Sequence, residues 1–278
     1  MSGASMNQIK ARMSGVRSTM QITRAMELVA TSKLPRARER AQNADTFCHC
    51  FERSVARLLG RGVDESCRWC HSESDKVLYI VIAGDRGLAG GYNSGVLRLV
   101  SGTRGENSVV LPWGKKAMDA YSRDGVELFD RGAPVAELDM GDCMDTARKV
   151  CRDFLEGRFG RVELVYTRFV SMLTQQPTQQ TLLPFGGEAH IEAVYDAVTD
   201  SDREALIDAI MPEYVGTMLY RAVCQSAASE SAARRTAMSA ANKNAEEMIE
   251  SLTLNYNRAR QAVITGEITE IVSGAGAP

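Results

Sequence analysis

The sequence lacks any long hydrophobic run. No apolar segment approaches the roughly 20 residues that a membrane-spanning helix requires. The amino-terminal residues also lack the apolar core of a secretory signal. We therefore expect a protein that is soluble or held at the surface of a membrane.

The chain also lacks a strong excess of charge of either sign. It has 33 Lys and Arg residues against 35 Asp and Glu residues, for a net charge of −2. This balance is not typical of nucleic-acid-binding proteins or of polybasic membrane-binding proteins. Residues 1–40 are an exception, with eight basic and two acidic side chains. We expect that segment to face an acidic partner or solvent.

Histidine is scarce, and this bears on catalysis. The three histidines, His49, His71 and His190, lie in separate segments and suggest neither a catalytic triad nor a metal-binding cluster. The sequence therefore predicts no catalytic residue and no metal site.

The signatures of phosphate-binding loops are incomplete. Residues 84–91 read Gly-Asp-Arg-Gly-Leu-Ala-Gly-Gly and follow an apolar run. The dinucleotide-binding fingerprint needs glycine at its first and third positions, whereas the third position here is Arg86. A Walker motif ending in Gly-Lys-Ser/Thr is missing as well. The pattern favours a tight turn from strand to helix, with nucleotide binding and partner contact as alternatives; no cofactor is predicted.

Seven cysteines are an odd number in a chain long enough to fold without disulfides. We expect reduced thiols in a cytosolic compartment. The segment Cys67-Arg-Trp-Cys70-His71 matches the spacing of a haem-attachment motif, and together with Cys48 and Cys50 it also permits a zinc site or a labile disulfide. We interpret these thiols as incidental, and the role of Cys67 and Cys70 stays open.

The amino-terminal segment, residues 1–58, has the pattern of one long amphipathic helix. Pro35 lies inside it, and because proline removes a helical hydrogen bond we predict a kink near residues 31–35. Apolar or small residues recur in steps of three and four at Ile9, Met13, Val16, Met20, Thr23, Ala30 and Leu34.

The carboxy-terminal segment, residues 201–278, also has the pattern of a long helix. Its apolar and small residues indicate a coiled-coil seam that is rich in alanine. The predicted seam consists of Met238, Ala241, Ala245, Met248, Leu252, Asn255, Ala259 and Ala262.

The middle of the chain alternates between strand and helix patterns, which indicates an α/β domain with a largely parallel sheet. Residues 76–83 form a continuous apolar run, typical of a strand buried on both faces. Further strands are expected at 108–112, 126–129 and 162–170, helices at 94–100, from 114 and at 142–156, and an edge hairpin at 171–184.

Together these patterns predict a fold class of α/β plus long coiled coil: an antiparallel coiled coil of the N- and C-terminal helices with a central Rossmann-like α/β domain. The helices would be roughly 80 and 100 Å long at ~1.5 Å per residue, too long for a globular domain to bury. The expected boundaries are 1–58 for the N-terminal shaft helix, 59–75 for a linker, 76–200 for the α/β foot domain and 201–278 for the C-terminal shaft helix.

Three blocks of this sequence resemble the gamma subunits of F-type ATP synthases, and together they cover both ends and the middle of the chain. The third block is the most specific because a long match in a fixed order is improbable by chance. The blocks are Ile9-Lys-Ala-Arg12 with Gln21 to Lys33, Asp85 to Gly91 with Asn93-Ser94, and Ser229 to Ala275 including Tyr256-Asn-Arg-Ala-Arg260-Gln261 and Thr265-Gly-Glu267.

The resemblance implies a central stalk that couples ion flow through a membrane ring to ATP synthesis or hydrolysis. Its partners would be three alpha and three beta subunits, the epsilon subunit and the c-ring, with no nucleic acid. The chain itself would be non-catalytic. It would lie on the cytoplasmic face of a bacterial inner membrane, peripheral to it, or on the matrix or stromal face in an organelle.

The resemblance also implies partner-binding residues. Met26, Arg234, Gln261, Thr265 and Glu267 match positions at which shaft residues govern coupling to the beta subunits. For each of them the alternative is an ordinary solvated helix face.

Three basic residues, Arg24, Lys33 and Arg260, are added on grounds of charge. A basic collar would complement acidic loops on the beta subunits. A solvated helix face is again the alternative. Within the third block, Asn242-Lys243 stands where the family usually has Thr-Asp.

Two other functions fit the patterns less well. An α/β enzyme would bind a nucleotide in the crevice at the strand ends. A coiled-coil scaffold would use the same long helices to dimerise.

Overall fold

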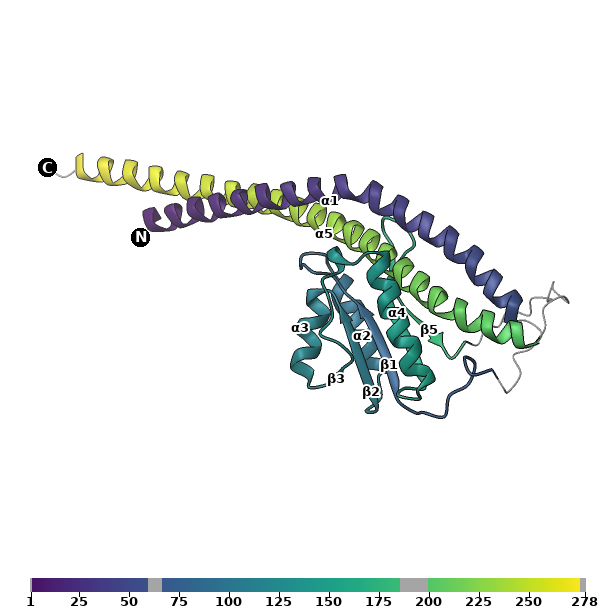
Figure 1. The fold of residues 1–278 in the computed structure, drawn as a ribbon. Coiled ribbons are helices and arrows are strands. Elements are labelled where there is room, and N and C mark those ends of the chain that lie inside the picture. The colour runs from purple at the N-terminus through teal and green to yellow at the C-terminus, as the bar shows by residue number, and fades with distance from the viewer. Residues whose placement is uncertain (1, 60–66, 186–199, 276–278) are drawn as a thin grey trace. The chain divides into compact units, whose positions relative to one another are not determined.

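A computed structural model of the 278-residue chain describes residues 2–59, 67–185 and 200–275 (Figure 1). Along the chain, one long helix precedes and another follows an α/β segment with a five-stranded sheet. This arrangement confirms the predicted fold class. The elements are α1 (Ser2–Leu59), β1 (Val77–Ile82), α2 (Tyr92–Thr103), β2 (Ser108–Trp113), α3 (Lys115–Asp124), β3 (Glu127–Leu128), a 3₁₀ turn η1 (Val135–Glu137), α4 (Met140–Leu155), β4 (Arg161–Phe169), β5 (Gln175–Leu183) and α5 (Asp200–Ala275).

The chain forms two compact units. The helix-pair unit comprises Met1–Ala30 and Arg235–Pro278, and the sheet unit comprises Thr31–Arg234. The four domain boundaries expected from the sequence stay a prediction. Residues 60–66 of the expected linker, and residues 186–199 with His190, lie outside the described residues.

The sheet has the order β3-β2-β1-β4-β5. β1 lies at its centre and pairs in parallel with β2 and β4, so that Ile80 faces Leu111 on one side and Leu164 on the other. β5 pairs antiparallel to β4 at the edge, as the predicted hairpin requires. The strand expected at 126–129 is reduced to Glu127–Leu128, and it pairs in parallel with β2.

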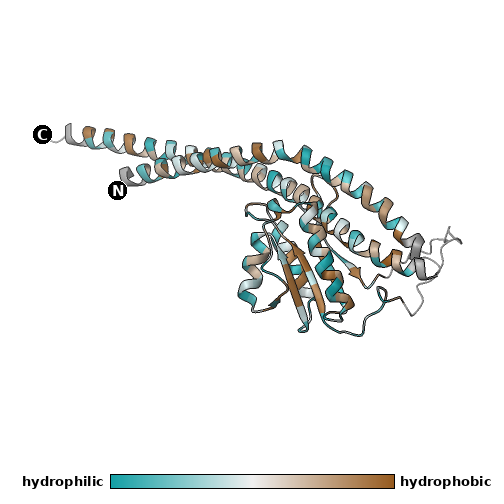
Figure 2. Cartoon of the chain, viewed as in Figure 1, coloured by the Kyte–Doolittle hydropathy of each residue, from teal (hydrophilic) through white to brown (hydrophobic). Residues whose placement is uncertain are grey.

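Side chains of β1 alternate between two hydrophobic cores, as the two-residue period of a strand requires. Leu78, Ile80 and Ile82 pack on the face that is covered by α4 and by the sheet-unit parts of α1 and α5. Tyr79 and Val81 pack on the opposite face against α2 and α3. Because helices cover both faces of the sheet, β1 is continuously apolar. Figure 2 shows the concentration of hydrophobic residues in the strands of the sheet.

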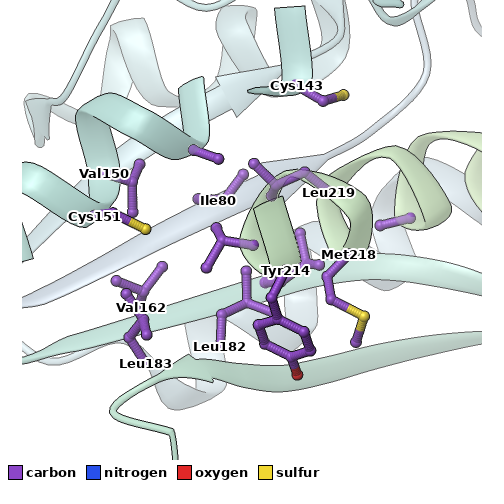
Figure 3. Close-up of a cluster of buried hydrophobic side chains, with 14 of the residues drawn as sticks. Ile80, Cys143, Val150, Cys151, Val162, Leu182, Leu183, Tyr214, Met218 and Leu219 are labelled. Carbon is purple, nitrogen blue, oxygen red and sulfur yellow. The ribbon is translucent and has the colours of Figure 1, made fainter. Parts of the chain in front are cut away.

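The larger core joins three layers of the chain. In Figure 3, Ile80 and Val162 of the sheet lie in one cluster with Val150 of α4 and with Met218 and Leu219 of α5. All five side chains are at most 2% exposed. The α5 segment in this cluster is therefore part of the hydrophobic core of the sheet unit.

Pro35 lies within α1 without ending it. The helix is continuous from Ser2 to Leu59, and the proline is exposed. The predicted kink near residues 31–35 stays a prediction. Ala30 and Leu34, on the predicted apolar stripe, are buried.

Part of the predicted seam on α5 is wrong. Five of the eight positions are buried or half-buried as expected, but Met248, Asn255 and Ala262 are exposed. From Met238 to Val272, the less exposed residues of α5 are Met238, Ala241, Asn242, Ala245, Ile249, Leu252, Thr253, Tyr256, Ala259 and Val263.

The error is a displacement by one residue at alternate seam positions. From Ala245 onward the predicted and observed stripes share every seventh residue and differ in between, where Tyr256 replaces Asn255 and Val263 replaces Ala262. Tyrosine and valine remove more apolar area from water than asparagine and alanine do. The stripe with the larger apolar side chains is therefore the one turned inward.

Gly114 joins β2 to α3, and its backbone needs glycine. Its φ angle is +93°, and a Cβ atom there would collide with the carbonyl oxygen of Ala83. We predict that Gly114→Ala lowers the free energy of unfolding by about 2 kcal/mol or more, because both the dihedral and the contact are unfavourable. Denaturant unfolding followed by circular dichroism measures this loss.

Gly102→Ala is the matched control. Gly102 lies in α2 with open space around the Cβ position. Because alanine favours helix over glycine by about 1 kcal/mol, this variant should be as stable as the original or slightly more stable. Equal losses for the two variants would contradict the assignment of strain to Gly114.

Candidate functional site

The glycine-rich loop, residues 84–91, follows β1 and is organised by the carboxylate of Asp85. Asp85 Oδ1 accepts hydrogen bonds from the backbone N–H groups of Lys115 and Val135, both at 3.1 Å, and Oδ2 accepts one from Ala136 at 3.0 Å. Hydrogen bonds to an ionised carboxylate are stronger than those between neutral groups, so Asp85 fixes the loop to the starts of α3 and η1.

A second set of contacts closes the loop on itself. The backbone N–H of Gly84 donates to Asn93 Oδ1 at 2.7 Å, and Asn93 Nδ2 donates to the carbonyl of Arg86 at 3.2 Å. Leu88, at the tip, has a φ angle of +62° and is 61% exposed. The loop is thus held in one conformation while it presents an apolar side chain to the surroundings.

Helix α5 packs against the same loop through Glu230 and Arg234. Arg234 Nη2 donates to Glu230 Oε1 at 2.5 Å and to the carbonyl of Gly87 at 3.4 Å. Both side chains are 17% exposed. A Cβ atom at Gly84 would lie 3.0 Å from the Glu230 carboxyl group, so glycine permits this close approach.

This electrostatic arrangement is unfavourable for a bound phosphate. The carboxylate of Asp85 occupies the backbone N–H of Lys115, the first residue of α3, where a phosphate would need free donors. Glu230 adds a second negative charge beside Gly84. Burial, followed by the nearby charge of Glu230, raises the pKa of Tyr92, so this hydroxyl stays protonated at neutral pH. The geometry favours the turn interpretation of the glycine loop.

Within the described residues, no group of three or more His, Cys, Asp or Glu side chains is arranged to hold a metal ion. In the same part of the chain, no helix is both long enough and apolar enough to cross a membrane.

The helix-pair unit contains a polar contact inside an apolar seam. Asn242 is 7% exposed; its Nδ2 donates to Glu27 Oε2 at 2.6 Å, and its Oδ1 accepts from Thr23 Oγ1 at 2.5 Å. Arg24 pairs with Glu246 one turn further along α5. Asn242 contacts Glu27 and Glu246 contacts Arg24, so α1 positions fall as α5 positions rise. The two helices therefore run antiparallel in this unit, as predicted.

A buried asparagine in such a seam can define register. If the helices slid past each other, Asn242, Thr23 and Glu27 would lose these partners in a partly dry environment. In the sequence, Asn242 stands out only as a departure from the family pattern. An amide flanked by apolar residues every three or four positions was the signal that could have identified it.

The eight predicted partner-binding residues fall into both units. Two of them lie in the sheet unit: Lys33 is exposed, whereas Arg234 is mostly buried. Arg234 forms an ion pair with Glu230 and a hydrogen bond with the carbonyl of Gly87. In the helix-pair unit Met26 is half-buried, Arg24 is exposed and paired, and the rest, all exposed on α5, are Arg260, Gln261, Thr265 and Glu267.

The structure does not gather these eight residues into one cluster. The Arg24–Glu246 pair has side chains that are 55% and 52% exposed, so we expect it to contribute only about 0–1 kcal/mol to stability. The partner-binding role of all eight residues stays a prediction.

Exposed apolar side chains are concentrated in the helix-pair unit. Of the 14 large hydrophobic residues that are exposed in the described part of the chain, nine belong to this unit. Their side chains are available for contact with another protein. They are Ile22, Leu28, Val29, Met248, Leu254, Ile264, Ile268, Ile271 and Val272.

We predict that Asn242→Ala lowers the free energy of unfolding by about 1–3 kcal/mol, because Glu27 and Thr23 lose a half-buried hydrogen-bond partner. Thermal unfolding of the full chain measures the change. Asn244→Ala, an exposed asparagine two residues further on, is the control and should change stability by less than about 0.5 kcal/mol. Equal effects of the two substitutions would show that the seam contact has no special energetic role.

Comparison with known proteins identifies the family. The family model described as ATP synthase matches residues 5–277. The chain is 44% identical to the ATP synthase gamma chain of Ruminococcus albus over 284 residues, and 38% identical to that of Heliobacterium modesticaldum over 287 residues; each match covers 98% of both chains. The fold is similar to a chain in the rotor of the Euglena gracilis mitochondrial ATP synthase, with a TM-score of 0.71, 18% identity, and coverage of 94% of this chain and 99% of that one. The chain therefore belongs to the family of ATP synthase gamma chains.

Proposed function

We propose that this chain is the rotating central stalk of an F-type ATP synthase, and that it couples ion flow through a membrane ring to ATP synthesis or hydrolysis. The observation that carries the proposal is the apolar face near the end of α5. Residues 264–272 are all exposed, and between 235 and 272 the last half-buried position is Val263. Four large aliphatic side chains lie on this end of the helix: Ile264, Ile268, Ile271 and Val272.

An apolar helix end suits a bearing inside a ring of subunits. Ile264, Ile268 and Ile271 recur in steps of four and three, so they lie along one face of the helix. Apolar contacts are non-directional, and they resist rotation less than ion pairs that form at one angle. We place this end in the cavity of a hexamer of three alpha and three beta subunits.

Rotation follows from asymmetry. Three catalytic sites of identical sequence differ only when something asymmetric contacts them, and one pair of helices inside a threefold ring is asymmetric. Each orientation of the stalk favours a different set of site conformations, because it interacts differently with each. By linkage, closure of the beta subunits during hydrolysis turns the stalk.

The chain contributes no ATP chemistry of its own in this proposal. Its most enzyme-like segment, the glycine loop, has Asp85 and Glu230 where a phosphate would need donors. The sheet unit would contact the epsilon subunit and the c-ring, and the whole chain would be peripheral to the membrane on its cytoplasmic face. No nucleic acid takes part.

Purification of the intact complex tests the assembly. The tagged chain should be recovered once per complex, beside three alpha and three beta subunits, as measured by native mass spectrometry. Recovery as a stable homodimer without alpha and beta would contradict the proposal, and so would saturable nucleotide binding by the isolated chain in calorimetry.

Met26→Lys tests coupling. Met26 is half-buried in the helix-pair unit, and a charge added there must be desolvated or pair with the ring at one angle. We predict that ATP synthesis driven by an ion gradient falls several-fold more than ATP hydrolysis, measured on the same vesicles. A parallel loss of both activities would argue against a coupling role for this position.

Ser54→Lys is the matched control for the added charge. Ser54 is exposed on the same helix but lies in the sheet unit, and its hydroxyl donates to the carbonyl of Cys50. Synthesis and hydrolysis should both stay at the level of the original complex.

A further inference from the structure

Residues 67–70 form a tight turn that brings two thiols together. The backbone N–H of Cys70 donates to the carbonyl of Cys67 at 2.9 Å, and Cys70 Sγ donates to Cys67 Sγ at 3.1 Å. The end residues of a four-residue turn have Cα atoms within about 7 Å, near the range that a disulfide spans. The two sulfurs need to approach by about 1 Å to reach the S–S bond length of ~2.05 Å.

Trp69, between the two cysteines, anchors this turn to the sheet unit. The indole is 2% exposed and stacks on Phe154 of α4 with a centroid distance of 6.4 Å. Its Nε1 donates to Asp208 of α5 at 2.6 Å, and its carbonyl accepts from the backbone N–H of Phe185 at 2.7 Å. These contacts hold the thiols in place before any reaction, so little ordering is needed to join them.

The two thiols differ in access. Cys67 is half-buried, whereas Cys70 is 8% exposed. Burial, and then the hydrogen bond to Cys67, raises the pKa of Cys70 to about 12. A reagent in solution therefore reaches Cys67 first, and Cys70 is positioned to react second.

The other cysteines lack this arrangement. All seven are free, and within the described residues Cys67 and Cys70 are the one pair of thiols joined by a hydrogen bond. Cys50 is exposed, and the remaining four are buried at Cys48, Cys143, Cys151 and Cys224.

We propose that Cys67 and Cys70 are a redox-active dithiol that is oxidised to an intrachain disulfide by small-molecule disulfides such as oxidised glutathione. The Cys67 thiolate attacks one sulfur of the reagent, forms a mixed disulfide and releases one thiolate. The Cys70 thiolate then attacks Cys67 Sγ, forms the S–S bond and releases the second thiolate. The two protons lost by the cysteines end on the two thiols released, so the cysteines are oxidised and the reagent is reduced. Excess thiol reverses the reaction.

The proposal does not depend on the role of the chain in a rotor. Its expected consequence is local: the disulfide closes the turn that links Trp69 to α4 and α5.

Thiol trapping tests the proposal. The full chain is equilibrated in mixtures of oxidised and reduced glutathione, free thiols are alkylated, and each cysteine is read by mass spectrometry. We expect Cys67 and Cys70 to lose alkylation together, at a ratio of oxidised to reduced glutathione at least about ten-fold lower than Cys50 requires, because the second step is intramolecular. Oxidation of Cys67 at the same ratio as Cys50 would overturn the proposal.

Two variants separate the steps. Cys70→Ser should trap the glutathione adduct on Cys67, which the original chain resolves, while Cys50→Ser should leave oxidation of the pair unchanged. Circular dichroism establishes that both variants are folded. A Cys67 adduct that is as abundant in the original chain as in Cys70→Ser would show that Cys70 does not resolve it, and would refute the dithiol.

Discussion

Helix α5 is the constraint on which the rest of the structure depends, because one continuous helix has to satisfy two different environments. In the sheet unit its residues from Met211 to Val223 pack into the main core, where Leu219 is fully buried. Beyond Arg235 it belongs to the helix-pair unit, where its neighbour is α1. A helix of 76 residues, about 110 Å at ~1.5 Å per residue, achieves this only by changing which residues it buries along its length.

Polar contacts are placed where α5 meets another element. In the sheet unit Arg221 pairs with Asp45 of α1 at 2.7 Å, and its side chain is 10% exposed. In the helix-pair unit Asn242 bonds to Thr23 and Glu27. Apolar contacts alone permit sliding of one helix past another, whereas a half-buried ion pair or amide is satisfied in one register only. Together these contacts define how α1 and α5 align within each unit.

The glycine loop shows how a motif that suggests catalysis serves structure instead. Its glycines allow β1 to end beside α5, its aspartate satisfies backbone donors on two neighbouring segments, and Arg234 binds its carbonyl. The carboxylate of Asp85, which stabilises the loop, would also repel a phosphate. Leu88, at the tip of the loop, stays exposed.

Periodicity and composition were sufficient to predict the two terminal helices, the order of strands and helices and the buried central strand, and three matched blocks of sequence were sufficient to indicate the family. Each of these depends on residues close in the chain, or on matches in a fixed order. The seam of α5 was only half predicted, because stripes that differ by one residue at alternate positions are both consistent with a period of 3.5, and the choice depends on which side chains the partner helix covers. Tertiary structure alone decided the roles of Asp85, Asn242 and Arg234 and the contact between Cys67 and Cys70. In each case the hydrogen-bond partner is a backbone or side-chain atom whose position is set only when the chain folds.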